Sequence, residues 1–171
     1  PESINMVTQR VIELGDKKET VTPEDLPFII ADVLGNEQII YKIFIRKYSL
    51  SLSYGLRPFA SVKMEIDGQI YEGTSSGDGQ YDAFMKAVRR IYDRIGKELP
   101  SLSDYQVSIP PGGRTDALVE TIISWKYNDK EFNTKGLDAD QTESAIKATE
   151  KMLNLIEGLN GTEHKAFSAE K

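Results

Sequence analysis

A glycine-rich segment from Gly77 to Ala83 has the residue types that best suit binding of a small charged molecule. It reads Gly-Asp-Gly-Gln-Tyr-Asp-Ala, follows a predicted β-hairpin and opens a predicted amphipathic helix. Its glycines permit a sharp turn or a close approach to a ligand, and the first N–H groups of a helix attract a carboxylate or phosphate. Asp82 would meet a positive charge, so the segment favours a zwitterion such as a free amino acid. A capped helix after a tight turn is the structural alternative, and these seven residues alone leave it open.

The residue inventory restricts the chemistry that this chain can perform. Its 171 residues include one histidine, His164, and no cysteine. Ser-His-Asp triads, Cys-His pairs and His-rich metal sites therefore cannot be assembled from it. Carboxylates are plentiful, but no pair of them stands at a spacing that demands a metal or an acid–base role. We expect no catalytic residue, no metal ligand and no cofactor in this chain.

Net charge and composition limit the kinds of partner that this chain can bind. The formal net charge of -6 argues against general nucleic-acid binding, because phosphate contacts need a basic face. Basic residues do cluster between Lys86 and Lys97, and we interpret them as a solvated helix face. No apolar run is long enough to span a bilayer, and the lack of cysteine is compatible with a cytoplasmic protein. Because the chain begins at Pro1, we expect it to be part of a larger protein.

Residues 1–45 predict a small helical linker module. Apolar residues recur at helical spacing up to Leu14, and Gly15 ends the pattern. Thr22 as N-cap with Pro23 at the first position predicts the start of a second helix, which ends at Gly35-Asn36. The module is too thin to bury a core of its own, so we expect it to need a partner.

Residues 46–159 predict two similar units, each of three strands and a helix, which repeat after about 60 residues. The hairpin turns are predicted at Asp67-Gly68 and Asn128-Asp129, and residues 41–47 fit strand or helix equally well. The predicted fold is α+β: two pseudo-twofold-related βββα units, at about 46–99 and 102–159, packed together behind the linker, with a flexible tail at 160–171. The second unit carries a single loop glycine, Gly136, which indicates that the loop of the first is specialised. The predicted strands are 39–53, 58–66, 69–74, 104–109, 117–127 and 131–135.

The segment from Ala60 to Leu159 resembles the C-terminal regulatory domain shared by 2-isopropylmalate synthase and citramalate synthase. The leading segment, Val11 to Pro27, looks like the linker that precedes that domain in citramalate synthases. Two departures concern the loops: Gln80 and Tyr81 stand where the family usually has proline and valine, and Asp138 and Asp140 where it has serine and asparagine. The motifs that carry the resemblance are Asp67-Gly68, Gly77-Asp78-Gly79, Asp82-Ala83, Leu102-Ser103-Asp104-Tyr105, Thr115-Asp116-Ala117, Thr134-Lys135-Gly136 and Ser144-Ala145.

This resemblance implies a regulatory role. The parent enzyme of the family condenses acetyl-CoA with a 2-oxo acid on an upstream barrel that holds a divalent metal, and the end-product amino acid binds at the homodimer interface of the regulatory domains. Loop amides around Gly79 would hold the effector carboxylate, and Asp82 its ammonium group. Tyr105 and Ile109 share one strand face by alternation, and the resemblance leads us to place them in the apolar wall. The expected effector-binding residues are Gly77, Asp78, Gly79, Gln80, Tyr81, Asp82, Ala83, Leu102, Tyr105, Ile109 and Val119.

The identity of the effector follows from the linker. Because the linker resembles that of citramalate synthase, whose product feeds isoleucine synthesis, isoleucine is the favoured effector. Leucine, with an isopropylmalate synthase parent, is the alternative. A domain that only dimerises its parent, without any ligand, is a third interpretation. Gly112-Gly113-Arg114 suggests a nucleotide-phosphate site, but no Gly-Lys-Thr or Gly-Lys-Ser follows a glycine loop.

Overall fold

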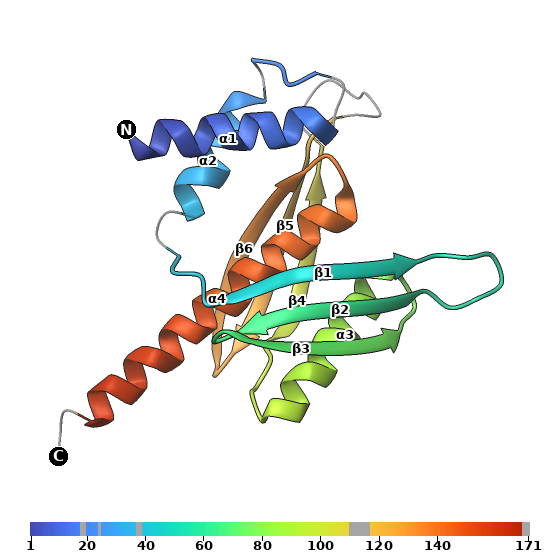
Figure 1. The fold of residues 1–171 in the computed structure, drawn as a ribbon, viewed down its shortest axis with the longest axis vertical. Helices are drawn as coiled ribbons and strands as arrows, with labels where there is room; N and C mark the ends of the chain where they lie inside the picture. The colour runs from blue at the N-terminus through green and yellow to red at the C-terminus, as the bar shows by residue number, and fades with distance from the viewer. Residues whose placement is uncertain (18–19, 24, 37–38, 110–116, 169–171) are drawn as a thin grey trace. The chain divides into compact units, whose positions relative to one another are not determined.

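The computed structural model describes residues 1–17, 20–23, 25–36, 39–109 and 117–168. It confirms the α+β class: two helices are followed by two successive βββα repeats (Figure 1). The chain divides into two compact units, Pro1–Ile40 with Leu102–Met152, and Tyr41–Ser101 with the helix from Leu153 onward. The elements are α1 (Glu2–Lys17), α2 (Leu26–Asn36), β1 (Ile43–Ser51), β2 (Phe59–Ile66), β3 (Gln69–Ser76), α3 (Gln80–Ile95), β4 (Ser101–Ser108), β5 (Val119–Tyr127), β6 (Lys130–Asp138) and α4 (Gln141–Ser168).

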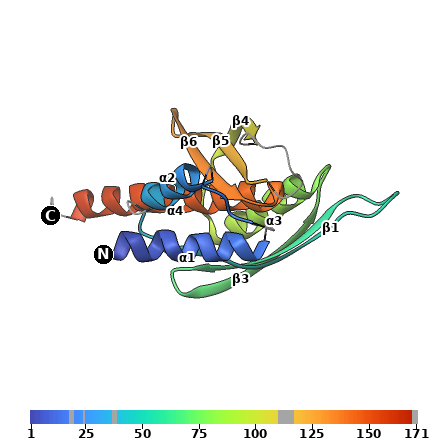
Figure 2. The same cartoon turned by 90° about the horizontal axis from the view of Figure 1, so that it is seen from above.

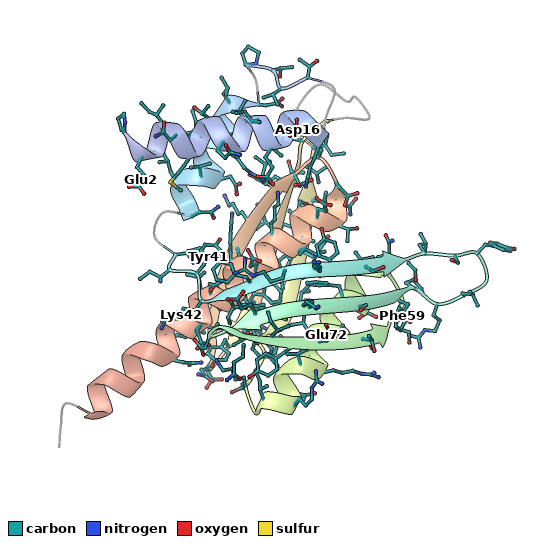
Figure 3. All side chains as sticks on the ribbon, in the orientation of Figure 1. Glu2, Asp16, Tyr41, Lys42, Phe59 and Glu72 are labelled. Atoms are coloured by element: carbon teal, nitrogen blue, oxygen red, sulfur yellow. The ribbon has the colours of Figure 1, made fainter. Side chains whose placement is uncertain are left out.

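The first repeat is an antiparallel sheet of order β1-β2-β3 with α3 across one face (Figure 1). Buried and exposed residues alternate along β2, as expected for a sheet covered on one side only. Figure 3 marks Lys42, where the chain enters β1, and Phe59, where β2 begins. The apolar stripe of α3 packs on the covered face, and the buried residues of the two elements are Ala60, Val62, Met64, Ile66, Ala83, Phe84, Ala87, Val88, Ile91 and Tyr92.

The second repeat has the order β4-β5-β6, and its covered face carries a buried polar chain. The indole N–H of Trp125 donates to Thr134 Oγ1 over 2.8 Å, and the Thr134 hydroxyl donates to the carbonyl of Ala148 over 2.7 Å. The buried side chains of Trp125 and Thr134 thus both have hydrogen-bond partners, as burial requires. These bonds tie β5 and β6 to the first half of α4.

Gly136 lies inside β6, opposite Thr121, and not in the loop where the sequence placed it. A Cβ built there would lie 1.8 Å from the carbonyl oxygen of Ser144. Glycine is therefore required for the close approach of β6 to α4. The prediction that Gly136 is the counterpart of the loop glycines of the first repeat was wrong, and a close strand–helix contact explains this glycine.

The two N-terminal helices lie side by side in both views (Figure 1 and Figure 2) and belong to the same compact unit as residues 102–152 of the second repeat. Leu14 of α1 and Ile29 of α2 are fully buried in one cluster with Leu118 and Leu137. The partner that the thin linker module was expected to need is therefore this part of the second repeat.

Three predicted helix boundaries were wrong. Helix α1 continues past Gly15 to Lys17, and α2 starts at Leu26. Ahead of α2, Asp25 Oδ2 accepts the N–H of Thr22, and the carbonyl of Asp25 accepts the N–H of Ile29 at the start of the helix. Helix α4 runs on to Ser168, so residues predicted as tail continue the helix.

Candidate functional site

The glycine segment forms the connection between β3 and α3. The N–H of Gly77 donates to the carbonyl of Pro58 over 3.0 Å, and that of Ala83 donates to the carbonyl of Gly79 over 2.9 Å. Gly79 is the N-cap residue of α3, with an extended backbone and no side-chain cap. A helix start of this kind directs its first N–H groups toward the loop. The predicted start of a helix directly after the glycines is confirmed.

The two glycines serve different purposes. A Cβ on Gly77 would lie 2.3 Å from the nitrogen of Ala83 and 2.7 Å from Asp82 Oδ2, whereas one on Gly79 would meet nothing within 4 Å. Close packing therefore demands the first glycine. The second glycine leaves the surface beside the helix start open.

Asp82 closes the loop with its carboxylate. Its Oδ2 accepts the N–H of Asp78 over 2.8 Å and lies 2.9 Å from the ammonium nitrogen of Lys86. These two contacts, the lysine first and the backbone N–H second, lower the pKa of Asp82 below its ordinary value. A carboxylate in this state is ionised at neutral pH and already holds one ammonium group.

Arg57 brings a second cation to the loop. Its Nη2 lies 2.9 Å from Asp78 Oδ1, and both side chains are exposed. Alternating carboxylates and cations therefore line the loop, an arrangement that suits a ligand carrying charges of both signs. Lys86 was interpreted from sequence only as part of a solvated face, although its spacing of four residues from Asp82 is the signal for a helical ion pair.

Tyr81 adds an aromatic surface next to the charged side chains of the loop. Its ring stacks on that of Phe84, with centroids 6.1 Å apart, and Phe84 in turn meets Tyr48 of β1 edge-on at 6.3 Å. Phe84 is fully buried, while Tyr81 and Gln80 are half-buried. The loop thus lies between the charged side chains described above and an aromatic cluster that includes the buried Phe84.

The remaining predicted residues belong to the second repeat. Tyr105 is half-buried, and burial raises the pKa of its hydroxyl although hydrogen bonds with Gln141 and Thr121 act in the opposite direction. Those partners place Tyr105 on the α4 side of the sheet, the side on which Val119 is buried. Leu102 falls on the opposite side by strand alternation.

The structure therefore sorts the predicted residues into separate sets. Residues 77–83 form one continuous segment of the first repeat, a short loop at 77–79 followed by the first turn of α3. In the second repeat, Tyr105 lies on one face of β4, Ile109 follows the end of that strand and is exposed, and Val119 is buried. Leu102 lies on the other strand face, so the second-repeat residues do not form a single apolar wall. Residues 112–114, which were considered from sequence and set aside as a phosphate site, lie outside the described residues.

Within the described ranges, no group of three or more His, Cys, Asp or Glu side chains is arranged to hold a metal ion. Among those same residues, no helix is long and apolar enough to cross a membrane.

Relatives of known name match this chain almost from end to end. It is 33% identical over 162 residues to a protein of Archaeoglobus fulgidus named as a candidate (R)-citramalate synthase, with 94% of this chain and 31% of that protein covered. It is 30% identical over 156 residues to 2-isopropylmalate synthase of Methanocaldococcus jannaschii (90% and 28% covered), and 28% identical over 158 residues to the (R)-citramalate synthase of the same organism (91% and 31%). The chain thus spans 28–31% of the length of these relatives.

The family described as the LeuA allosteric (dimerisation) domain matches residues 20–157, which include α2, both repeats and most of α4. This match confirms the resemblance to the regulatory domain of the two synthases. The chain belongs to the LeuA allosteric (dimerisation) domain family.

Proposed function

We propose that this chain is the effector-binding part of a synthase that condenses acetyl-CoA with pyruvate, and that it binds isoleucine for feedback inhibition. The match to an allosteric domain family is the observation that carries this proposal. Two citramalate synthase relatives support the choice of parent enzyme. The catalytic barrel, its divalent metal and the acetyl-CoA site would lie upstream of this chain, and the active form would be a homodimer.

The loop supplies the two polar contacts that an amino acid needs. The N-terminal end of α3 offers N–H donors to the carboxylate, and Asp82 offers an acceptor to the ammonium group. A charge-assisted hydrogen bond of this kind contributes about 1.5–3 kcal/mol. Because Lys86 already lies 2.9 Å from Asp82 Oδ2, the effector ammonium would have to share or displace that lysine.

Isothermal titration calorimetry with isoleucine, leucine and valine tests the proposal on this chain. Asp82→Asn is the informative variant, because its amide oxygen still accepts the N–H of Asp78 and only the charge is lost. We expect at least about tenfold weaker isoleucine binding, since one charged contact is worth more than 1.4 kcal/mol. Lys86→Met removes the competing cation and should strengthen binding. Unchanged affinity in both variants would mean that Asp82 is not the ammonium partner.

Leucine is the second candidate effector, favoured by relatives named as 2-isopropylmalate synthases, one of them 30% identical to this chain. An apolar pocket separates two such isomers by only about 1–3 kcal/mol, so the ratio of the two affinities decides between them. A domain that only dimerises would show no heat with any of the three amino acids and would still sediment as a dimer.

A further inference from the structure

Asp138 is a fully buried carboxylate at the end of β6, and it receives two lysines. Its Oδ2 lies 3.0 Å from the ammonium nitrogen of Lys17 on α1 and 2.6 Å from that of Lys147 on α4. Its Oδ1 accepts the N–H of Asp140 over 3.1 Å. The Lys17 ammonium also contacts Glu143 at the start of α4. One lysine of the linker is thus held between two carboxylates of the second repeat.

A second charged group joins the same elements. Asp32 of α2 lies 2.6 Å from the ammonium nitrogen of Lys151 and 3.4 Å from Nε of Arg10, and all three side chains are nearly buried. The guanidinium of Arg10 also donates to the backbone carbonyl of Leu137. Sheltered pairs of this kind are directional and depend on good geometry. Both linker helices are therefore tied to β6 or α4 by charged contacts.

The two repeats use equivalent positions differently. Counted from the glutamine that opens each helix, Lys147 corresponds to Lys86 and Glu143 to Asp82. In the first repeat the lysine pairs with the helix carboxylate at the surface. In the second repeat Lys147 pairs with Asp138 instead, and the ammonium of Lys17 contacts the helix carboxylate. The position corresponding to Asp138 in the first repeat is Gly77, which has no side chain.

We propose that Asp138 and Glu143 form a built-in socket for the Lys17 ammonium, and that this socket holds α1 in one register on the second repeat. The apolar cluster around Leu14 attracts the helix but is not directional. The socket fixes the position of α1 on the second repeat, because only one placement of α1 brings its lysine between the two carboxylates. Residues 1–36 and the second repeat then move as one body, whether or not an effector binds elsewhere.

Hydrogen–deuterium exchange of the full chain tests this socket. Lys17→Met removes the occupant and leaves Asp138 paired with Lys147, and Asp138→Asn removes the main charge of the socket. We expect the amides of α1 to exchange about tenfold faster in either variant, the change that corresponds to losing one charged hydrogen bond, while α3 is unchanged. The matched control is Lys63→Met, which removes an exposed ion pair with Glu72 in the first repeat and should leave α1 unchanged.

The double variant adds a test that general destabilisation would fail. Because Lys17→Met and Asp138→Asn remove the same contact, together they should speed α1 exchange little more than Asp138→Asn alone. Additive effects, or α1 exchange that stays at the wild-type rate in Lys17→Met, would overturn the proposal. If Asp138→Asn does not fold, the same comparison of single and double variants is made with Lys17→Met and Glu143→Gln, and non-additive effects on α1 exchange again support the proposal.

Discussion

The side-chain amide of Asn154 pairs with the backbone of Ile43 in both directions. Its Oδ1 accepts the N–H of Ile43 over 2.9 Å and that of Lys42 over 2.7 Å, and its Nδ2 donates to the carbonyl of Ile43 over 2.8 Å. The amide therefore acts as a neighbouring strand would at the start of β1. Both residues are buried, so these bonds have no water to replace them.

Asn154→Asp should destabilise the protein by about 2–4 kcal/mol, because a carboxylate would face the carbonyl of Ile43 in a buried place. Urea unfolding followed by circular dichroism measures the loss. Asn133→Asp on the exposed side of β6 is the control, expected to change stability by less than about 0.5 kcal/mol. Equal losses of unfolding free energy in the two variants would show that the hydrogen bonds between Asn154 and Ile43 do not stabilise the protein.

Gly77→Ala and Gly79→Ala should differ sharply. The first places a Cβ against the backbone of Ala83 and should cost about 2 kcal/mol through overpacking. The second enters open space at an extended N-cap and should cost about 0.5 kcal/mol. Thermal unfolding of both variants checks the order, and a larger loss at Gly79 would contradict the packing assigned to this loop.

Acid should weaken the attachment of α1 through Asp138. Burial opposes ionisation of this carboxyl, but Lys147, the N–H of Asp140 and Lys17 together hold its pKa below the ordinary value. A lowered pKa in the folded state stabilises the protein above the unfolded pKa, and that contribution disappears as the pH falls through the folded pKa. Glu143 is the second carboxylate that contacts the ammonium group of Lys17.

The unfolding free energy of the wild type and of Asp138→Asn should therefore converge as the pH falls from about 7 toward 3. Chemical denaturation at a series of pH values measures this difference. A difference that stays constant over the whole range would show that Asp138 does not contribute as a carboxylate.

Gly158→Ala should stabilise α4 by about 1 kcal/mol and raise the melting temperature by about 3 °C. The residue lies within the helix and its Cβ would meet nothing within 4 Å. Gly96→Ala is the opposite case, since Gly96 ends α3 in the left-handed region at φ 68°, where a side chain is strained. Scanning calorimetry should show one variant melting above the wild type and the other below it.

Local signals in the sequence predicted the hairpins well. Asp67-Gly68 and Asn128-Asp129 were predicted as turns, and all four residues have positive φ in the structure. Asp140 was predicted to start a helix, and its Oδ1 accepts the N–H of Glu143 over 2.9 Å. These features succeeded because residues adjacent in the chain determine them.

The predictions that failed depend on contacts between distant residues. Ser101-Leu102-Ser103 carries no burial pattern, because every residue of β4 except the half-buried Tyr105 is exposed, so the beginning of this strand was missed. Lys17 and Asp138 are 121 positions apart, and no sequence pattern near either residue predicts their ion pair. Gly136 was assigned to a loop because its clash with the helix carbonyl becomes visible only when β6 and α4 are packed together.

Trp125 gives the protein a built-in optical reporter. It is the single tryptophan of the chain, fully buried and bonded to Thr134. Its emission should be blue-shifted in the native state and should move to longer wavelength only when the second repeat loosens. Fluorescence can therefore time the opening of one repeat without any label, while the tyrosines of the first repeat remain spectrally separate.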